Sequence, residues 1–151
     1  MTANRTLLRL ERLGGREAPS ATAVAVPTGA AGGIYRAAAA TDAGRGYLFH
    51  GAADLPGQGH FDVAGELKSA GLVRGGHASG LLVLNGRTGL VVLGLTGPDQ
   101  DGPAALPDTF TYTVIGGSGL YRGLRGTGTL SLTPNALQGR GPQFGAFSIA
   151  F

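Results

Sequence analysis

The chain has 151 residues and 29 of them are glycine, about one residue in five against a usual share of about 7 %. Glycine inside a helix costs about 0.5–1 kcal/mol relative to alanine, so this content excludes a helix-dominated fold, and the lack of a three-residue period excludes collagen. With 42 % hydrophobic and 14 % charged residues, the composition predicts one compact domain spanning residues 1–151 rather than a disordered chain.

Several kinds of chemistry and several partners are excluded by residue type. The chain has no cysteine and only three histidines, and no two histidines have the spacing of metal ligands, so we expect no disulfide, metal or cofactor. The net charge is +3, but the arginines are scattered, so nucleic acid is not a predicted partner. No stretch approaches the ~18 apolar residues of a membrane span, and we expect a cytoplasmic protein without a membrane partner.

The N-terminal third contains three predicted strands and one predicted helix. Residues 6–13 carry four leucines, which favours a strand over a single helical turn. Residues 21–26 and 47–53 are two further strands, since apolar side chains recur there. Residues 34–43 are rich in alanine, and we expect a short helix that ends near Gly44.

The middle of the chain predicts antiparallel strands joined by tight turns. From His60 onward, apolar and polar residues alternate through Lys68, which is the pattern of a half-buried strand whose charged residues, Glu66 among them, face solvent. Residues 81–84 and 90–96 flank an Asn-Gly turn that is typical of a hairpin. Both hairpin strands are apolar on both faces, so either another element or a second subunit must cover the outer face, and we expect a homo-oligomer.

The C-terminal third continues the same pattern. Residues 97–103 form a predicted polar loop, and Phe110, Tyr112 and Val114 then alternate with threonines. In the last predicted strand Phe147, Ile149 and Phe151 share one face, so the C-terminus closes the sheet. About nine strands at this spacing predict an all-β fold, a single antiparallel β-barrel of about 8–9 strands.

Two sequence blocks carry a family resemblance. Residues 59–65 read Gly-His-Phe-Asp-Val-Ala-Gly, and residues 110–130 hold a strand, a Gly-Gly-Ser-Gly-Leu-Tyr turn and a second strand. These blocks resemble the allene oxide cyclase and dirigent barrel family, of calycin type. The resemblance implies an eight-stranded barrel with an apolar cavity, assembled as a trimer or dimer. The family's catalytic tyrosine corresponds to Leu67 here, so allene oxide cyclisation itself is not predicted.

The candidate site residues come from strand faces and from this resemblance. Tyr112 points inward by parity, and a buried hydroxyl needs a partner or a ligand. Glu11 is the only acid in the first predicted strand, and it faces solvent unless the register slips by one residue. These two are the predicted catalytic residues. The predicted ligand-binding residues line the same lumen: Tyr47, Phe49, Phe110, Tyr121 and Leu67.

Two functions follow as expectations. The first is an isomerase or cyclase, without a cofactor, that folds a hydrophobic small molecule by the shape of its lumen. The second is a non-catalytic barrel that binds a hydrophobic ligand or acts as a self-assembling structural protein. A lumen of about 300 Å³ or more, lined by Tyr112 and another polar group, would favour ligand binding or catalysis. A lumen filled by apolar side chains would exclude both and leave the structural protein.

Overall fold

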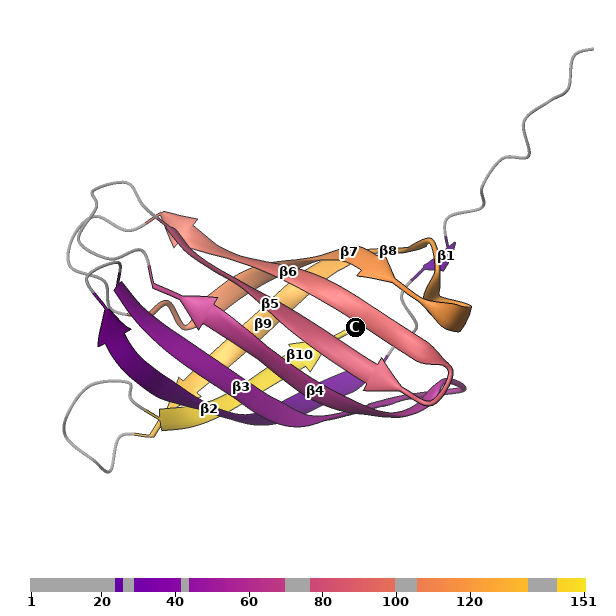
Figure 1. The fold of residues 1–151 in the computed structure, drawn as a ribbon, viewed down its shortest axis with the longest axis horizontal. Coiled ribbons are helices and arrows are strands. Elements are labelled where there is room, and N and C mark those ends of the chain that lie inside the picture. The colour runs from indigo at the N-terminus through magenta and orange to yellow at the C-terminus, as the bar shows by residue number, and fades with distance from the viewer. Residues whose placement is uncertain (1–23, 26–28, 42–43, 70–76, 100–105, 136–143) are drawn as a thin grey trace, which may run out of the picture.

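The computed structural model is a closed antiparallel β-barrel (Figure 1). It describes residues 24–25, 29–41, 44–69, 77–99, 106–135 and 144–151. Eight strands close the barrel in the order β10-β2-β3-β4-β5-β6-β7-β9. The all-β fold and the eight-stranded barrel predicted from the sequence are therefore confirmed.

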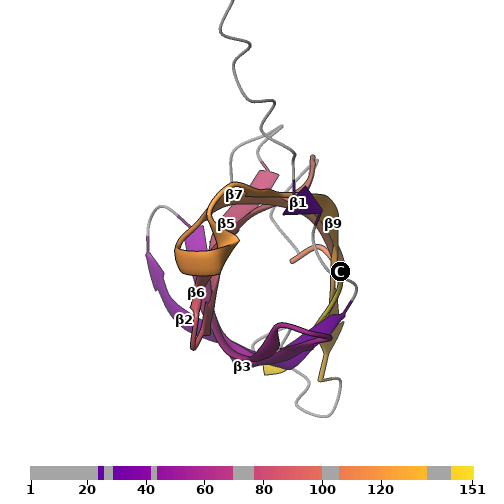
Figure 2. The same ribbon diagram turned by 90° about the vertical axis from the view of Figure 1, so that its right-hand side faces the viewer.

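The elements follow one another along the chain as a meander. The barrel strands are β2 Ala30–Thr41, β3 Gly44–Leu55, β4 Gly59–Lys68, β5 His77–Gly86, β6 Gly89–Asp99, β7 Thr109–Gly117, β9 Thr127–Pro134 and β10 Phe144–Ala150. Two short strands, β1 Val24–Ala25 and β8 Leu124–Arg125, pair in parallel outside the barrel. One 3₁₀ turn, η1 Gly119–Tyr121, lies beside one end of the barrel, which Figure 2 views end on.

The last strand closes the barrel, as its parity predicted. β10 pairs with β9 on one side and with β2 on the other. Phe147 and Ile149 point inward and are buried, whereas Ser148 between them and Ala150 after them are exposed. A strand paired on both sides has no free edge, and closure therefore removes the exposed edges that an open sheet would present.

Two predicted elements differ from the structure. The helix expected at residues 34–43 is wrong, because residues 34–41 belong to β2, which forms ladders with β3 and β10. Backbone pairing on both sides outweighs the helical propensity of alanine, which is the highest of any residue but small in energy. The polar loop expected at residues 97–103 begins too early, since β6 extends to Asp99 and Gly97 is buried.

The glycine-rich connection after β7 is only partly as predicted. Gly119 has φ 59° and Gly123 has φ 83°, a left-handed conformation that favours glycine. Gly116 and Gly117 belong to β7 instead. Two other predicted segments fall outside the described residues: all of 6–13, with Glu11, and most of 21–26.

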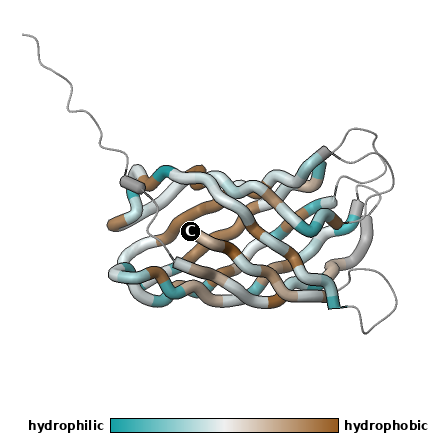
Figure 3. Tube along the Cα trace, turned by 180° about the vertical axis from the view of Figure 1, so that it is seen from behind, coloured by the Kyte–Doolittle hydropathy of each residue, from teal (hydrophilic) through white to brown (hydrophobic). Residues whose placement is uncertain are grey.

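The hydrophobic core is the barrel lumen. Alternation along each strand directs every second side chain inward. Together with neighbouring apolar residues, these side chains form a single buried cluster of 25 residues. In Figure 3 brown hydrophobic positions recur along the strands between paler ones. No helix among the described residues is long and apolar enough to span a membrane.

Candidate functional site

The lumen holds six of the seven predicted site residues. Tyr112 and Phe110 on β7, Tyr47 and Phe49 on β3, Leu67 on β4 and Tyr121 on η1 are all buried in one apolar cluster. Their predicted inward orientation is confirmed. Glu11, the predicted acid, lies outside the described residues.

The centre of the lumen is packed. Tyr35, Phe61, Val63, Leu67, Leu82, Leu93 and Leu130 each have 0 % of their surface exposed. A water-sized void touching any of these side chains would leave part of its surface accessible. No water-sized void therefore touches these seven side chains, which come from β2, β4, β5, β6 and β9.

Tyr112 uses its hydroxyl within the protein. The hydroxyl donates a hydrogen bond to the backbone carbonyl of Ala150 over 3.3 Å, and its ring packs 5.7 Å from that of Phe151. Burial raises the pKa of Tyr112 above the ordinary tyrosine value of 10.0. A satisfied phenol that holds its proton more firmly than usual is a poor general base at neutral pH.

Tyr35 was not predicted, and its hydroxyl is the one buried side-chain polar atom among the described residues without a hydrogen-bond partner. Its ring lies 5.8 Å from that of Phe49 and 6.2 Å from that of Tyr47. Burial raises its pKa, with smaller contributions in the same direction from Tyr47 and Asp108. An unpaired buried hydroxyl costs about 1–3 kcal/mol, so this position is energetically unfavourable in the free protein.

Tyr47 differs from Tyr35 because it has a charged neighbour. Burial raises the pKa of Tyr47, while attraction to the Arg45 guanidinium and a hydrogen bond with it act in the opposite direction. Guanidinium only donates hydrogen bonds, so the Tyr47 oxygen accepts. Tyr35 and Tyr47 thus bring two phenol groups and one cation to the same part of the barrel.

Tyr121 closes the end of the barrel beside η1. Its ring packs 5.3 Å from that of Phe61, and its hydroxyl is 2.9 Å from the Thr88 hydroxyl on the β5–β6 turn. This matches the expectation that the glycine turn folds an aromatic ring over the barrel end. The contacts explain Tyr121 as packing, with its polar atom satisfied.

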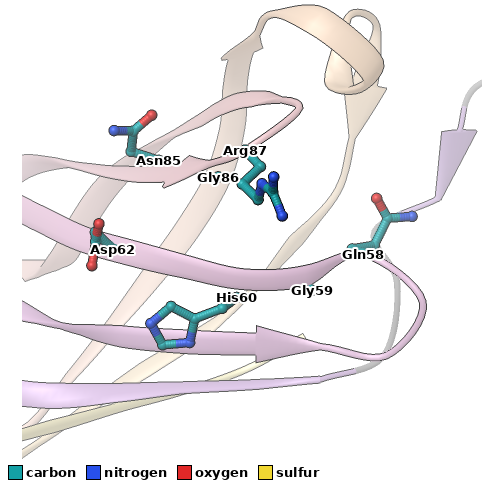
Figure 4. Close-up of a pocket in the computed structure, with 7 residues that line it drawn as sticks. All are labelled: Gln58, Gly59, His60, Asp62, Asn85, Gly86 and Arg87. Atoms are coloured by element: carbon teal, nitrogen blue, oxygen red, sulfur yellow. The ribbon is translucent and has the colours of Figure 1, made fainter.

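A polar hollow of about 420 Å³ lies between the β3–β4 turn and the β5–β6 hairpin (Figure 4). Its lining includes His60, Asp62, Asn85 and Arg87. His60 Nδ1 is 2.9 Å from an oxygen of Asp54, and this hydrogen bond raises the pKa of the imidazole. Both side chains are exposed, and no group of three metal-ligating residues occurs in the described ranges. The hollow holds no serine or other hydroxyl for His60 to activate.

A second hollow, of about 350 Å³, lies on the outer wall of the barrel. It is lined by Ile34 and Arg36 on β2, Leu48, Phe49 and His50 on β3, and Ala64 and Gly65 on β4. Ile34 and Leu48 are 49 % and 41 % exposed, and Leu81 on neighbouring β5 is 44 % exposed. We use the name apolar wall for the outward residues of β2, β3, β4 and β5 around this hollow, which are Ile34, Arg36, Leu48, His50, Ala64, Glu66 and Leu81.

The apolar wall overlaps the surface that the sequence predicted but is not identical to it. The sequence predicts one exposed apolar face on the hairpin of β5 and β6. Val83, Leu90 and Val92 are half-buried, so the exposed apolar surface lies over β2 and β3 as well. That part was hidden from sequence reasoning because residues 34–43 were assigned to a helix.

No family model matches the chain, and no curated protein or solved structure matches it either. The resemblance to allene oxide cyclases and dirigent barrels therefore stays a prediction beyond the barrel fold itself. The function has to be argued from the lumen and the wall.

Proposed function

We propose that this protein is a non-catalytic, self-associating structural barrel. One observation carries the proposal: large apolar side chains on the adjacent strands β2 and β3, Ile34 and Leu48, stay about half exposed beside each other around a surface hollow. Contiguous exposed apolar surface on a small protein marks an interaction site. The centre of the lumen supports the non-catalytic part, because seven of its side chains have no exposed surface and the hydroxyl of Tyr112 already donates to Ala150.

The experiment measures the oligomeric state of the purified protein. Native mass spectrometry and sedimentation velocity over a range of concentrations should show a reversible oligomer. Leu48→Asp places a charge in the middle of the apolar wall and should shift the population to monomer. Leu120→Asp is the matched control, since Leu120 is 76 % exposed on η1, away from the wall. A wild-type monomer at every concentration would reject the proposal.

A second candidate function, binding of a hydrophobic ligand, is favoured by the unpaired hydroxyl of Tyr35. Tyr35 has no exposed surface, so a ligand with an apolar tail and a carboxylate or carbonyl oxygen would accept a hydrogen bond there only after the surrounding rings move apart. Decanoate and decyltrimethylammonium share the tail, and only decanoate has an acceptor. If this function holds, decanoate binds preferentially and Tyr35→Phe weakens it about two- to tenfold, while Tyr112→Phe does not. Equal binding of both probes, or no binding, would reject it.

A further inference from the structure

The apolar wall has an internal symmetry in its charges. One row of residues across three adjacent strands reads Arg36 on β2, Leu48 on β3 and Glu66 on β4, because Arg36 pairs with Leu48 and Leu48 pairs with Glu66. All three are exposed on the outer surface. An apolar residue therefore stands midway between one cation and one anion.

These two charges are not used within the barrel. Neither Arg36 nor Glu66 has an ion pair with any residue in the described part of the chain. They lie two strands apart, about 10 Å at the usual strand spacing, on either side of Leu48. Each charge is thus available to a partner.

We propose that the wall packs against the same wall of a second copy, about a two-fold axis that lies in the interface and runs along β3 through Leu48. This inference rests on the proposed self-association and specifies its geometry. Rotation about that axis brings Leu48 onto Leu48 of the partner subunit. It brings Arg36 opposite Glu66 of the partner subunit and, by symmetry, Glu66 opposite Arg36 of the partner subunit.

The shape of the neighbouring row fits the same arrangement. Ile34 on β2, His50 on β3 and Ala64 on β4 form that row. Ile34 projects from one side of His50, whereas Ala64 and Gly65 leave part of the 350 Å³ hollow on the other side. The two-fold rotation places Ile34 of each copy over the small residues of the other, so a protruding side chain meets a depression.

Opposite charges on either side of the axis distinguish a second copy from an unrelated apolar partner. A surface used only for hydrophobic contact has no need of a cation and an anion at equal distances from its centre. Charge complementarity of this kind fixes register and excludes other orientations of the same patch. It also excludes the translation-related, head-to-tail contact that would build open filaments.

Charge reversal tests the geometry directly. Arg36→Glu leaves an interface with acidic residues at both positions, and Glu66→Arg leaves one with basic residues at both. Each variant alone puts like charges opposite each other twice, and we expect its dissociation constant to rise about tenfold or more. The double variant restores both attractive pairs, and its dissociation constant should return to near the wild-type value.

Mixing the two single variants gives a second, independent readout. An Arg36→Glu chain and a Glu66→Arg chain have complementary charges at both contacts, so native mass spectrometry of an equimolar mixture should show heterodimers in excess of either homodimer. Arg122→Glu is the matched control, because Arg122 is exposed and directly follows η1, which is not part of the apolar wall. It should leave the dissociation constant unchanged.

The outcomes separate this inference from the proposed function. A wild-type monomer overturns both. A wild-type oligomer whose dissociation constant responds to Leu48→Asp but not to either charge reversal keeps the self-association and rejects the two-fold arrangement. A trimer in the mass spectrum rejects the two-fold axis as well. Circular dichroism and urea unfolding of each variant show whether a change in assembly reflects a change in fold.

Discussion

Two inward-facing tyrosines lie near opposite ends of β10 and meet different polar surroundings. Tyr112 occupies the space left by Gly128 on β9 and donates to the carbonyl of Ala150 at the end of β10. Tyr35 occupies the space left by Gly145 near the start of β10, and its hydroxyl finds no partner. The same residue type with the same inward parity is satisfied at one place and unsatisfied at the other.

The difference shows that the ring of a lumen tyrosine contributes to packing whether or not its hydroxyl has a partner. Both rings are buried, with 0–1 % of their surface exposed, and both pack against a further aromatic ring. A phenylalanine would serve the packing at either place. The hydroxyl adds stability at Tyr112 and subtracts it at Tyr35, unless a ligand reaches Tyr35.

Removing either ring should give the largest effect and no contrast between the two regions. Tyr35→Ala and Tyr112→Ala should each lower the free energy of unfolding by about 3–5 kcal/mol, as deletion of a buried aromatic ring usually does. Urea unfolding followed by circular dichroism measures this. Tyr35→Leu and Tyr112→Leu give smaller losses and serve if the alanine variants do not fold. A loss at one position only would show that the lumen is loosely packed at the other.

Adding a methyl group beside each ring should give the next largest effect. A Cβ at Gly145 would lie 2.6 Å from the Tyr35 hydroxyl oxygen, and a Cβ at Gly128 would lie 2.5 Å from that of Tyr112. Gly145→Ala and Gly128→Ala should therefore each cost about 1–3 kcal/mol of stability. Gly116→Ala is the control, because nothing lies within 4 Å of its Cβ position. Its midpoint of thermal unfolding should equal that of the wild type. Tolerance of alanine at either strand position would contradict the close approach.

The Tyr112 side of this comparison could be predicted from the sequence. Phe110, Tyr112 and Val114 alternate with threonines, and this contrast in hydropathy indicates which face is inward. The same contrast identified the faces of β4 and β10. Local periodicity is sufficient wherever the two faces of a strand differ in polarity.

The Tyr35 side could not be predicted in the same way. The inward residues of β2 around it are the small Ala31, Gly33 and Ala37, and the outward residues include both Ile34 and Arg36, so polarity does not alternate along this strand, and the alanine run favoured a helix. Pairing with β3 and β10 decides the conformation, and that pairing is not local in the sequence. The row Arg36–Leu48–Glu66 was missed for the same reason, because it depends on the register of three strands.

Removing only the hydroxyls should have opposite effects in the two regions. Tyr112→Phe loses the bond to Ala150 and should lower the free energy of unfolding by about 0.5–1.5 kcal/mol. Tyr35→Phe removes an unpaired buried hydroxyl and should be neutral or raise it by up to about 1 kcal/mol. Urea unfolding of both variants beside the wild type measures the difference. A destabilised Tyr35→Phe would mean that the hydroxyl has a partner and that the contrast between the regions is smaller than the structure indicates.

The exposed pair of His60 and Asp54 should show the smallest effect and gives a reference for polar contacts outside the lumen. Hydrogen bonding to Asp54 raises the pKa of His60 above the ordinary histidine value of 6.5. A raised imidazole pKa contributes stability that is complete below pH 6.5 and is lost as the pH rises through the folded-state value. Both side chains are exposed, so solvent screens the pair. Asp54→Asn should therefore lower the His60 pKa, followed by NMR titration, while the unfolding midpoint at pH 8 stays unchanged. An unchanged pKa would show that the pair does not persist in solution, and the buried tyrosines would then be the only polar contacts in this comparison that affect the fold.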